Sequence, residues 1–145
     1  MGRYAVIELE KEELKFSAGH FMVLSPTERE SLHGHDYQLH ILFKTLIEDN
    51  GMAFDCRLYK KKLATICQSL DYRFILPKHS KFLQVIEDNA KWVVKFRDQT
   101  IPFLKADAVV LPIANVTLEE LSLWFLDGVD LRPGASSGYG HLGLM

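Results

Sequence analysis

Apolar and polar residues alternate in three segments of the first third of the chain, which predicts strands with one buried face. These segments are residues 4–9 (YAVIEL), 14–21 (LKFSAGHF) and 33–47 (HGHDYQLHILFKTLI), the last being rich in β-branched and aromatic residues. One face of the second segment carries Leu14, Phe16, Ala18 and His20. A polar loop (SPTERES) separates the second segment from the third, and we expect these two strands to pair antiparallel.

Two further segments follow the helical period of 3.6 residues. The first runs from about residue 57 to residue 70, after a turn at 48–51 (EDNG). Its apolar face carries Tyr59, Leu63, Ile66 and Leu70. The second helix begins at Thr117, because a threonine N-cap followed three residues later by Glu120 forms a capping box, and Gly128 marks its end.

The region between the two helices predicts a hairpin and a short strand. Residues 82–88 (FLQVIED) and 90–98 (AKWVVKFRD) are extended runs joined at a turn, and residues 108–113 (AVVLPI) form another extended run. The tail after Val129 contains four of the nine glycines, so we expect little regular strand there.

Length, composition and charge narrow the class of protein. With 145 residues, 48% of them hydrophobic and 25% charged, the chain fits a single globular α+β domain over residues 1–145. A formal net charge of −2 provides no basic field for phosphate backbones, which argues against a nucleic-acid partner. The sequence contains no run of about 20 apolar residues and its amino terminus is acidic, so we expect a cytoplasmic protein without a membrane segment.

The two cysteines, Cys56 and Cys67, have no CxxC partner. This spacing argues against both a disulfide framework and a thiolate zinc site, and predicts packed, reduced thiols.

The histidines carry the strongest chemical signal. His33 and His35 are two residues apart on a strand, so their side chains point to the same face. His20 ends the preceding strand, and antiparallel pairing can bring its ring beside the other two. Three neutral imidazoles suit zinc and leave a fourth position for water or substrate. The alternative is a pair of hydrogen-bonded surface histidines without a metal.

The remaining histidines offer no comparable pattern. His40 falls on the opposite strand face and His79 follows Pro77 in a loop, so we expect both to be ordinary solvent-facing histidines. His141 lies in the glycine-rich tail and receives no assignment.

Five motifs occur in an order that resembles one enzyme family. They are FSAGHF, LHGHDYQLHI, NGMAFDCRLYKKKL, SLDYR and TLEELSLWF. Over roughly residues 14–75 and 115–126 the chain resembles the 6-pyruvoyltetrahydropterin synthase family, which includes the 6-carboxytetrahydropterin synthases of the queuosine pathway. The resemblance implies the tunnelling fold, an antiparallel sheet with two helices packed on one face that assembles into an oligomeric barrel, here a homo-oligomeric hexamer or tetramer. It also implies zinc on His20, His33 and His35, with a pterin bound at a subunit interface.

The resemblance implies catalytic positions as well. The family commonly has a catalytic cysteine in the loop before HGH, whereas RESLHGH resembles a subgroup in which a glutamate, here Glu30, takes its place. A partly buried carboxylate can act as a general base, and the alternative for Glu30 is a carboxylate in solvent. Asp71 matches the aspartate of the family's Asp-His pair, and Tyr72 stands where the histidine is expected.

Thr117 and Glu119 match residues that line the family's pterin site, while Leu131 stands where the family has a glutamate for the pterin's amidine edge. Leucine cannot supply a carboxylate, so Glu119 or a residue of another subunit would have to replace it. The stretch 77–112 is longer than usual in the family, and either caps the pocket or extends a subunit contact.

Together with these residues, the resemblance implies a zinc-dependent lyase acting on 7,8-dihydroneopterin triphosphate or a related pterin. A glutamate in place of the cysteine favours carbon–carbon cleavage to a 6-hydroxymethyl-dihydropterin over the pyruvoyl product, as the resembling subgroup implies. The alternative, suggested by Tyr72 and Leu131, is a zinc-containing pterin- or purine-binding protein without turnover.

Overall fold

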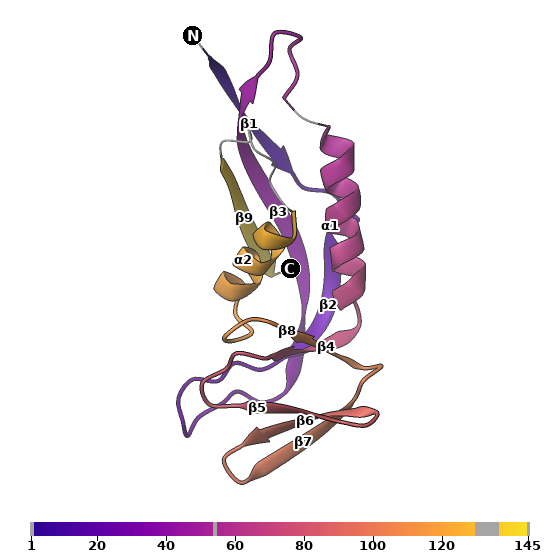
Figure 1. The fold of residues 1–145 in the computed structure, drawn as a ribbon, viewed down its shortest axis with the longest axis vertical. Helices are drawn as coiled ribbons and strands as arrows, with labels where there is room; N and C mark the ends of the chain where they lie inside the picture. The colour runs from indigo at the N-terminus through magenta and orange to yellow at the C-terminus, as the bar shows by residue number, and fades with distance from the viewer. Residues whose placement is uncertain (1, 54, 130–136, 145) are drawn as a thin grey trace.

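A long central strand, β3 (His33–Ile47), organises the main sheet. The structure, a computed structural model, describes residues 2–53, 55–129 and 137–144. β1 (Arg3–Leu9) and β2 (Lys15–His20) both run antiparallel to β3, β1 beside its second half and β2 beside its first half. β9 (Ser137–Leu144) overlaps both of their ranges on β3, so it occupies the opposite edge (Figure 1). The predicted antiparallel pairing of β2 with β3 is confirmed.

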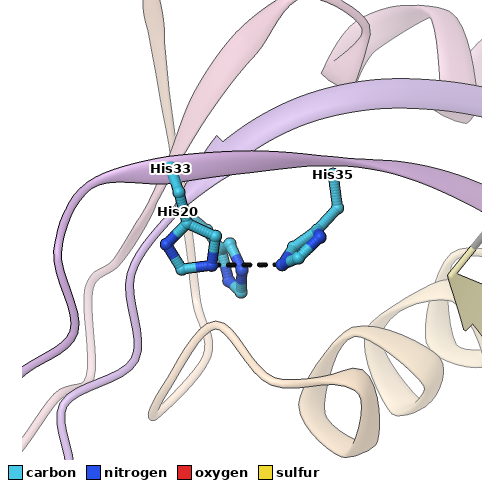
Figure 2. Close-up of side chains that lie close together, drawn as sticks. All are labelled: His20, His33 and His35. Carbon is cyan, nitrogen blue, oxygen red and sulfur yellow. Dashed lines mark hydrogen bonds between the residues drawn. The ribbon is translucent and has the colours of Figure 1, made fainter.

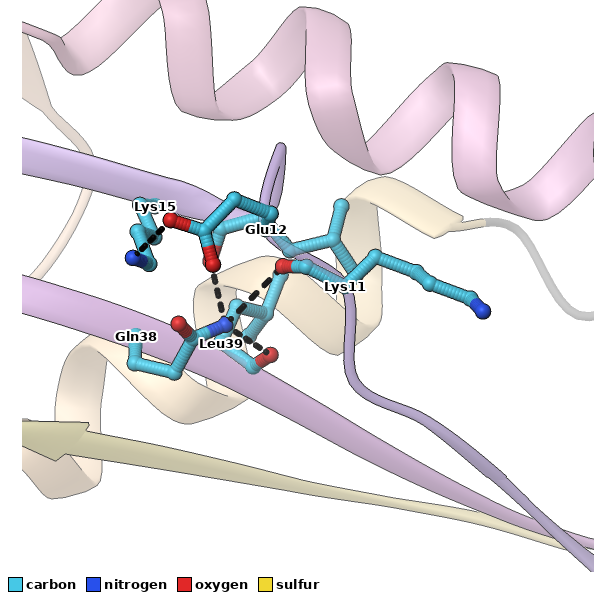
Figure 3. Close-up of polar contacts among 6 residues, drawn as sticks. Lys11, Glu12, Lys15, Gln38 and Leu39 are labelled. Atoms are coloured by element: carbon cyan, nitrogen blue, oxygen red, sulfur yellow. Dashed lines mark hydrogen bonds and ion pairs between the residues drawn. The ribbon is translucent and has the colours of Figure 1, made fainter.

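A short loop interrupts the edge that β1 and β2 share. The side-chain amide of Gln38 in β3 donates to the carbonyl oxygens of Lys11 and Leu14 at 3.2 and 3.1 Å, and lies 3.3 Å from that of Leu39 (Figure 3). Leu39 N also donates to Leu14 O at 2.8 Å. One polar side chain therefore supplies partners for the backbone where the strand pairing breaks, and β2 resumes in register with β3.

Beyond β2 the sheet continues with two parallel strands. The second of them, at 108–111, falls in the predicted extended run, whereas the first strand and the parallel pairing were not predicted. β4 (Arg73–Pro77) pairs parallel with β2, and β8 (Ala108–Leu111) pairs parallel with β4. The expectation of little strand in the tail is wrong, because β9 pairs with β3 over eight residues. The open edge of β3 supplies partners for backbone groups that glycine-rich sequence would otherwise leave to solvent.

Both helices, α1 (Cys56–Leu70) and α2 (Leu118–Val129), pack on one face of the main sheet (Figure 1). The core beneath them includes Phe16, Ala18, Tyr37, Leu39, Leu63, Cys67, Leu70, Leu121 and Phe125. Thr117 Oγ1 accepts from Glu120 N at 3.2 Å, which confirms the predicted N-cap. The helix passes through Gly128 and ends one residue later at Val129, whose side chain is fully buried.

The thiol of Cys67 is reduced and lies in this core, as expected, whereas the Cys56 side chain lies outside the described residues. None of the described helices is long and apolar enough to cross a membrane.

A second, three-stranded sheet fills the stretch 77–112. β5 (Gln84–Asp88) and β6 (Lys91–Phe96) form the predicted hairpin, and β7 (Gln99–Leu104), which was not anticipated, pairs antiparallel with β6. Its inner face contributes Val94 and Phe96 to a separate core cluster, which also contains Phe21, Val23, Leu76, Leu83 and Ala108. The second sheet thus packs against the residues that follow β2, close to the predicted metal ligands.

Candidate metal centre and active site

The three predicted metal ligands lie together at one end of β2 and β3. His20 and His33 are register partners, and His35 follows on the same face. Figure 2 shows the three rings turned toward one another, and their potential ligand nitrogens all lie within 4.8 Å. His33 Nε2 and His35 Nε2 are 3.1 Å apart. The alternation of side chains along two paired strands therefore produces the arrangement that the sequence predicts.

Backbone carbonyl groups orient two of these rings. His20 Nδ1 lies 2.9 Å from Val116 O, and His33 Nδ1 lies 2.7 Å from Ser31 O. A carbonyl oxygen only accepts hydrogen bonds, so both Nδ1 atoms carry the proton. In the neutral rings, Nε2 is then left with a lone pair directed at the centre of the cluster.

The buried nitrogen of His20 has no partner within the described residues. Its ring is 6% exposed, and Nε2 makes no hydrogen bond there. Burial lowers the pKa of His20, and the neighbouring rings of His33 and His35 act in the same direction, although the hydrogen bond to Val116 opposes the shift. The neutral form is the one that binds a metal ion. A buried polar atom without a partner is costly, so this donor set fits a cation held by three imidazoles.

Glu30 lies in the loop between β2 and β3, three residues before His33. Its Oε1 accepts from Met22 N at 2.8 Å, and Glu30 N donates to Met22 O at 2.9 Å. The side chain is half-buried, and its charge acts on both His20 and Tyr37. Burial, with a further contribution from this charge, raises the pKa of Tyr37 to about 12. Glu30 is therefore a fixed carboxylate beside the histidine cluster.

Asp71 and Tyr72 lie between the end of α1 and β4, beside Ser17 of β2. Asp71 Oδ1 accepts from Ser17 N at 2.8 Å, and Tyr72 N donates to Ser17 O at 2.7 Å. Ser17 is the neighbour of Ala18, so its side chain faces away from the core, where it hydrogen-bonds with Asp36. Tyr72 is 85% exposed and has a φ of +59°. The structure does not bring these two predicted residues to the histidines of the same copy.

The start of α2 lies against His20 through Val116. Thr117 caps the helix, and Glu119 is exposed in its first turn. Leu131 lies outside the described residues, so its position relative to these groups stays a prediction.

Asn115 is a residue that the sequence did not point to. Its Oδ1 accepts from Val23 N and from Val116 N, both at 3.1 Å, and its Nδ2 donates to Val23 O at 2.9 Å. It thereby joins the loop that carries Glu30 to the residue that orients His20. An asparagine before an N-cap is common in sequences and gives no signal of such long-range contacts.

The histidines outside the cluster follow the predictions in part. His79 is exposed, as expected. His40 is not an ordinary solvent histidine, because Nε2 lies 3.0 Å from Glu10 Oε1 and Nδ1 lies 3.7 Å from Glu8 Oε1. These carboxylates come from the neighbouring strand and the residue after it. The alternation of side chains along one strand does not reveal which residues of its neighbour lie opposite.

A family profile described as 6-pyruvoyl tetrahydropterin synthase matches residues 8–135. The chain belongs to this family. A relative in Methanocaldococcus jannaschii, provisionally named 6-carboxy-5,6,7,8-tetrahydropterin synthase, is 27% identical over 117 residues, which cover 80% of this chain and 71% of that protein. The chain is therefore a relative of tetrahydropterin synthase enzymes.

Solved structures of the tetrahydropterin synthase family share this fold. The 6-pyruvoyl tetrahydropterin synthase of Plasmodium falciparum superposes with a TM-score of 0.79 at 28% identity, over 87% of this chain and 77% of that one. The Plasmodium vivax enzyme gives a TM-score of 0.80 at 25% identity over 99% of both chains. One P. vivax structure at 24% identity, which by itself shows the fold alone, is a variant whose catalytic glutamate is replaced by alanine. The predicted α+β fold of this family is confirmed.

Proposed function

We propose that this member of the tetrahydropterin synthase family is a zinc-dependent lyase that acts on 7,8-dihydroneopterin triphosphate or a related pterin. The observation that carries the proposal is the buried, unpartnered Nε2 of His20, which faces the Nε2 atoms of His33 and His35. His20, His33 and His35 would hold the ion. When bound, zinc supplies a Lewis acid that can polarise a side-chain hydroxyl of the pterin.

Glu30 serves as the general base in this proposal. Its Oε1 is held by Met22 N, its side chain is half-buried, and its charge acts on His20. The glutamate that is named as catalytic in the P. vivax variant supports the same role for a carboxylate here. Glu30 would take the proton of the hydroxyl on the outer carbon, and that carbon would leave as an aldehyde that carries the phosphorylated end of the side chain. The electrons of the broken carbon–carbon bond would pass into the conjugated pterin ring. The carbon that stays on the ring would then take up a proton, for example from protonated Glu30, to give the 6-hydroxymethyl-dihydropterin.

Thr117 and Glu119 would bind the pterin at the start of α2, next to the Val116 carbonyl that orients His20. Glu119 is exposed and free of the helix-capping role that Thr117 fulfils. Its carboxylate would accept hydrogen bonds from the amidine edge of the pterin, the contact that Leu131 cannot make.

Asp71 and Tyr72 would act at the metal centre of a neighbouring copy in a homo-oligomer. Both are held beside Ser17 and make no hydrogen bond to the histidines of their own copy within the described residues, and Tyr72 is exposed. Mixing inactive His33→Ala copies with inactive Asp71→Ala copies should restore part of the activity, because some sites then combine an intact histidine cluster with an intact Asp71. Absence of recovery in mixed assemblies would place Asp71 outside the reaction.

The second candidate is a metal-containing pterin-binding protein without turnover. Tyr72 favours it, because a phenol transfers protons less readily at neutral pH than the imidazole of the family's Asp-His pair. Product analysis after incubation with dihydroneopterin triphosphate decides between the two candidates.

Metal analysis tests the centre directly. The purified protein should contain about one zinc per subunit, and a His33→Ala variant should lose it. His79→Ala, which removes an exposed histidine away from the cluster, should keep the metal. Folded wild-type protein that takes up no zinc when it is supplied would overturn the proposed centre.

Turnover of dihydroneopterin triphosphate tests the role of Glu30. Glu30→Gln removes the base and should lower kcat by roughly 10²–10⁴-fold, with zinc retained. Glu28→Gln, an exposed glutamate on the same loop, is the matched control and should turn over normally. An active Glu30→Gln variant would remove Glu30 from the mechanism.

A further inference from the structure

The loop that carries Glu30 is folded back on itself. Val23 and Arg29 form an isolated antiparallel bridge, Leu24 N donates to Glu28 O at 2.9 Å, and Glu30 N donates to Met22 O at 2.9 Å. Glu30 therefore stands at the base of a small hairpin, opposite Met22 on the arm that continues from His20. Any movement of this hairpin would move the carboxylate relative to the histidines.

The second sheet contacts this hairpin from outside. Arg29 Nε donates to Gln99 Oε1 at 2.9 Å, and Arg97 Nη1 lies 3.5 Å from Thr27 O. Gln99 begins β7, and Arg97 lies in the tight turn between β6 and β7 with a φ of +55°. The turn of the second sheet thus lies directly against the loop that bears the proposed base.

Arg29 contacts the Glu30 backbone, the second sheet and a buried aromatic ring at the same time. Its Nη1 donates to Glu30 O at 2.9 Å, while its guanidinium carbon lies 5.4 Å from the centre of the Phe21 ring. Phe21 is fully buried and directly follows His20. A planar guanidinium can donate in two directions and stack on an aromatic ring at the same time, whereas an ammonium group has no such geometry.

We propose that Arg29 is a positioning residue for Glu30, and that Gln99 of the second sheet holds Arg29 in place. The inference rests on the proposed role of Glu30 as the base. It assigns a role to the stretch 77–112, whose sheet supports the catalytic loop from outside. A displacement of about 1 Å at a reacting group can cost as much as 10²-fold in rate, so small losses of support have measurable effects.

A double-mutant cycle between Arg29 and Glu30 tests the proposal. Arg29→Ala should lower kcat by roughly 10–100-fold, with KM for the pterin within about two-fold and zinc content unchanged. Combined with Glu30→Gln, the same substitution should lower kcat no further, because Arg29 acts through the carboxylate that is already absent. Arg29→Lys should resemble Arg29→Ala, and Gln99→Ala should give a smaller loss in the same direction.

The matched control is Lys95→Ala, which removes an exposed basic side chain of β6 that makes none of these contacts, and it should keep kcat within about two-fold. Equal effects of Arg29→Ala in the wild type and in the Glu30→Gln variant would show a general structural role and overturn the proposal. An unchanged kcat in Arg29→Ala would overturn it as well.

Hydrogen exchange separates this inference from the proposed function. If the wild-type protein has no turnover, the role of Glu30 as a base fails. The claim that Arg29 holds the Glu30 loop in place can still be tested. Arg29→Ala should then speed exchange of the Met22 and Glu30 amides about ten-fold or more, while the amides of β3 remain unchanged. Equal exchange at Met22 and Glu30 in both proteins would overturn the positioning role by itself.

Discussion

Two carbonyl oxygens decide which nitrogen of two histidines faces the centre of the cluster. Val116 O and Ser31 O each accept from an Nδ1 atom, so His20 and His33 both present Nε2 inward. Ser31 lies two residues before its histidine, whereas Val116 lies 96 residues from its own. The tautomer of His20 therefore depends on the docking of α2, and the cluster is assembled only when the whole domain is folded.

At Gly19 the sheet allows no side chain at all. A Cβ atom there would lie 2.4 Å from Phe74 Cδ2, whereas at its register partner Gly34 it would lie 3.2 Å from Ala18 O. Gly19→Ala should lower the free energy of unfolding by about 1–3 kcal/mol, because the Phe74 ring must move. Urea denaturation measures the loss. Adding Phe74→Leu should recover part of it, and strictly additive effects would show that this contact is not the cause.

The buried thiol of Cys67 predicts a loss of stability at high pH. Burial, with a smaller contribution from the charge of Asp71, raises the pKa of Cys67 from 9.0 to about 12. Between these values the unfolded thiol is ionised and the folded thiol is not, so the folded state binds more protons. Stability from this group is complete below pH 9 and decreases above it by as much as about 1.4 kcal/mol per pH unit.

Urea unfolding of the wild type and Cys67→Ala from pH 7 to about pH 10.5 checks the effect of this thiol, with Cys56 present in both proteins. The variant should be less stable at neutral pH because of the cavity, but its stability should fall less steeply as the pH rises. Parallel slopes for the two proteins would assign the alkaline loss to other groups.

At the scale of elements, regular alternation explains what the sequence could predict. β3 has the predicted bounds because its pattern is long and one of its faces is buried from Tyr37 to Thr45. β4 was missed because it is buried on both sides: Ile75 belongs to the core under the helices and Leu76 to the core of the second sheet. A short run that is apolar on both faces lacks the alternation of apolar and polar residues that identifies a strand.

The same reasoning applies to the site. The alternation of side chains along two paired strands was enough to predict that the three histidines lie together, since their positions follow from local geometry. Arg29 and Asn115 act through contacts with residues 70 and 92 positions away, and these contacts leave no local pattern in the sequence. Asp71 was proposed from a motif, and its position beside Ser17 depends on a hydrogen bond that only the fold reveals.

Asn115 provides a test of how the loop and α2 are coupled. Asn115→Ala removes the partners of Val23 N and Val23 O, both on a buried residue, and should cost about 1–3 kcal/mol in the free energy of unfolding. The control is Asn50→Ala, whose side chain makes one hydrogen bond, to Met52 N, in an exposed turn. Equal losses in the two variants, measured by urea denaturation, would contradict a specific coupling role.

At the scale of the molecule, two cores share the same strands. β4 and β8 contribute Ile75 and Leu111 to the core under the helices, and Leu76 and Ala108 to the core of the second sheet. Neither core can open without exposing a face of these two strands. The described part of the chain should therefore behave as one cooperative unit despite its two sheets.

The two tryptophans of the chain report on the two cores separately, because Trp92 packs against the second core and Trp124 against the first. In Trp92→Phe and Trp124→Phe variants, the fluorescence midpoint in urea should coincide with the far-UV circular dichroism midpoint of the same variant. Adding Leu76→Ala, which empties a fully buried position in β4, should lower the stability of both variants by about 2–5 kcal/mol. If only the Trp92 signal moved to lower urea, the second sheet would unfold on its own. Its support of the Glu30 loop would then vary with temperature and denaturant while the histidine cluster stayed intact. Under such conditions the effect of releasing Glu30 could be measured separately from the effect of losing the metal centre.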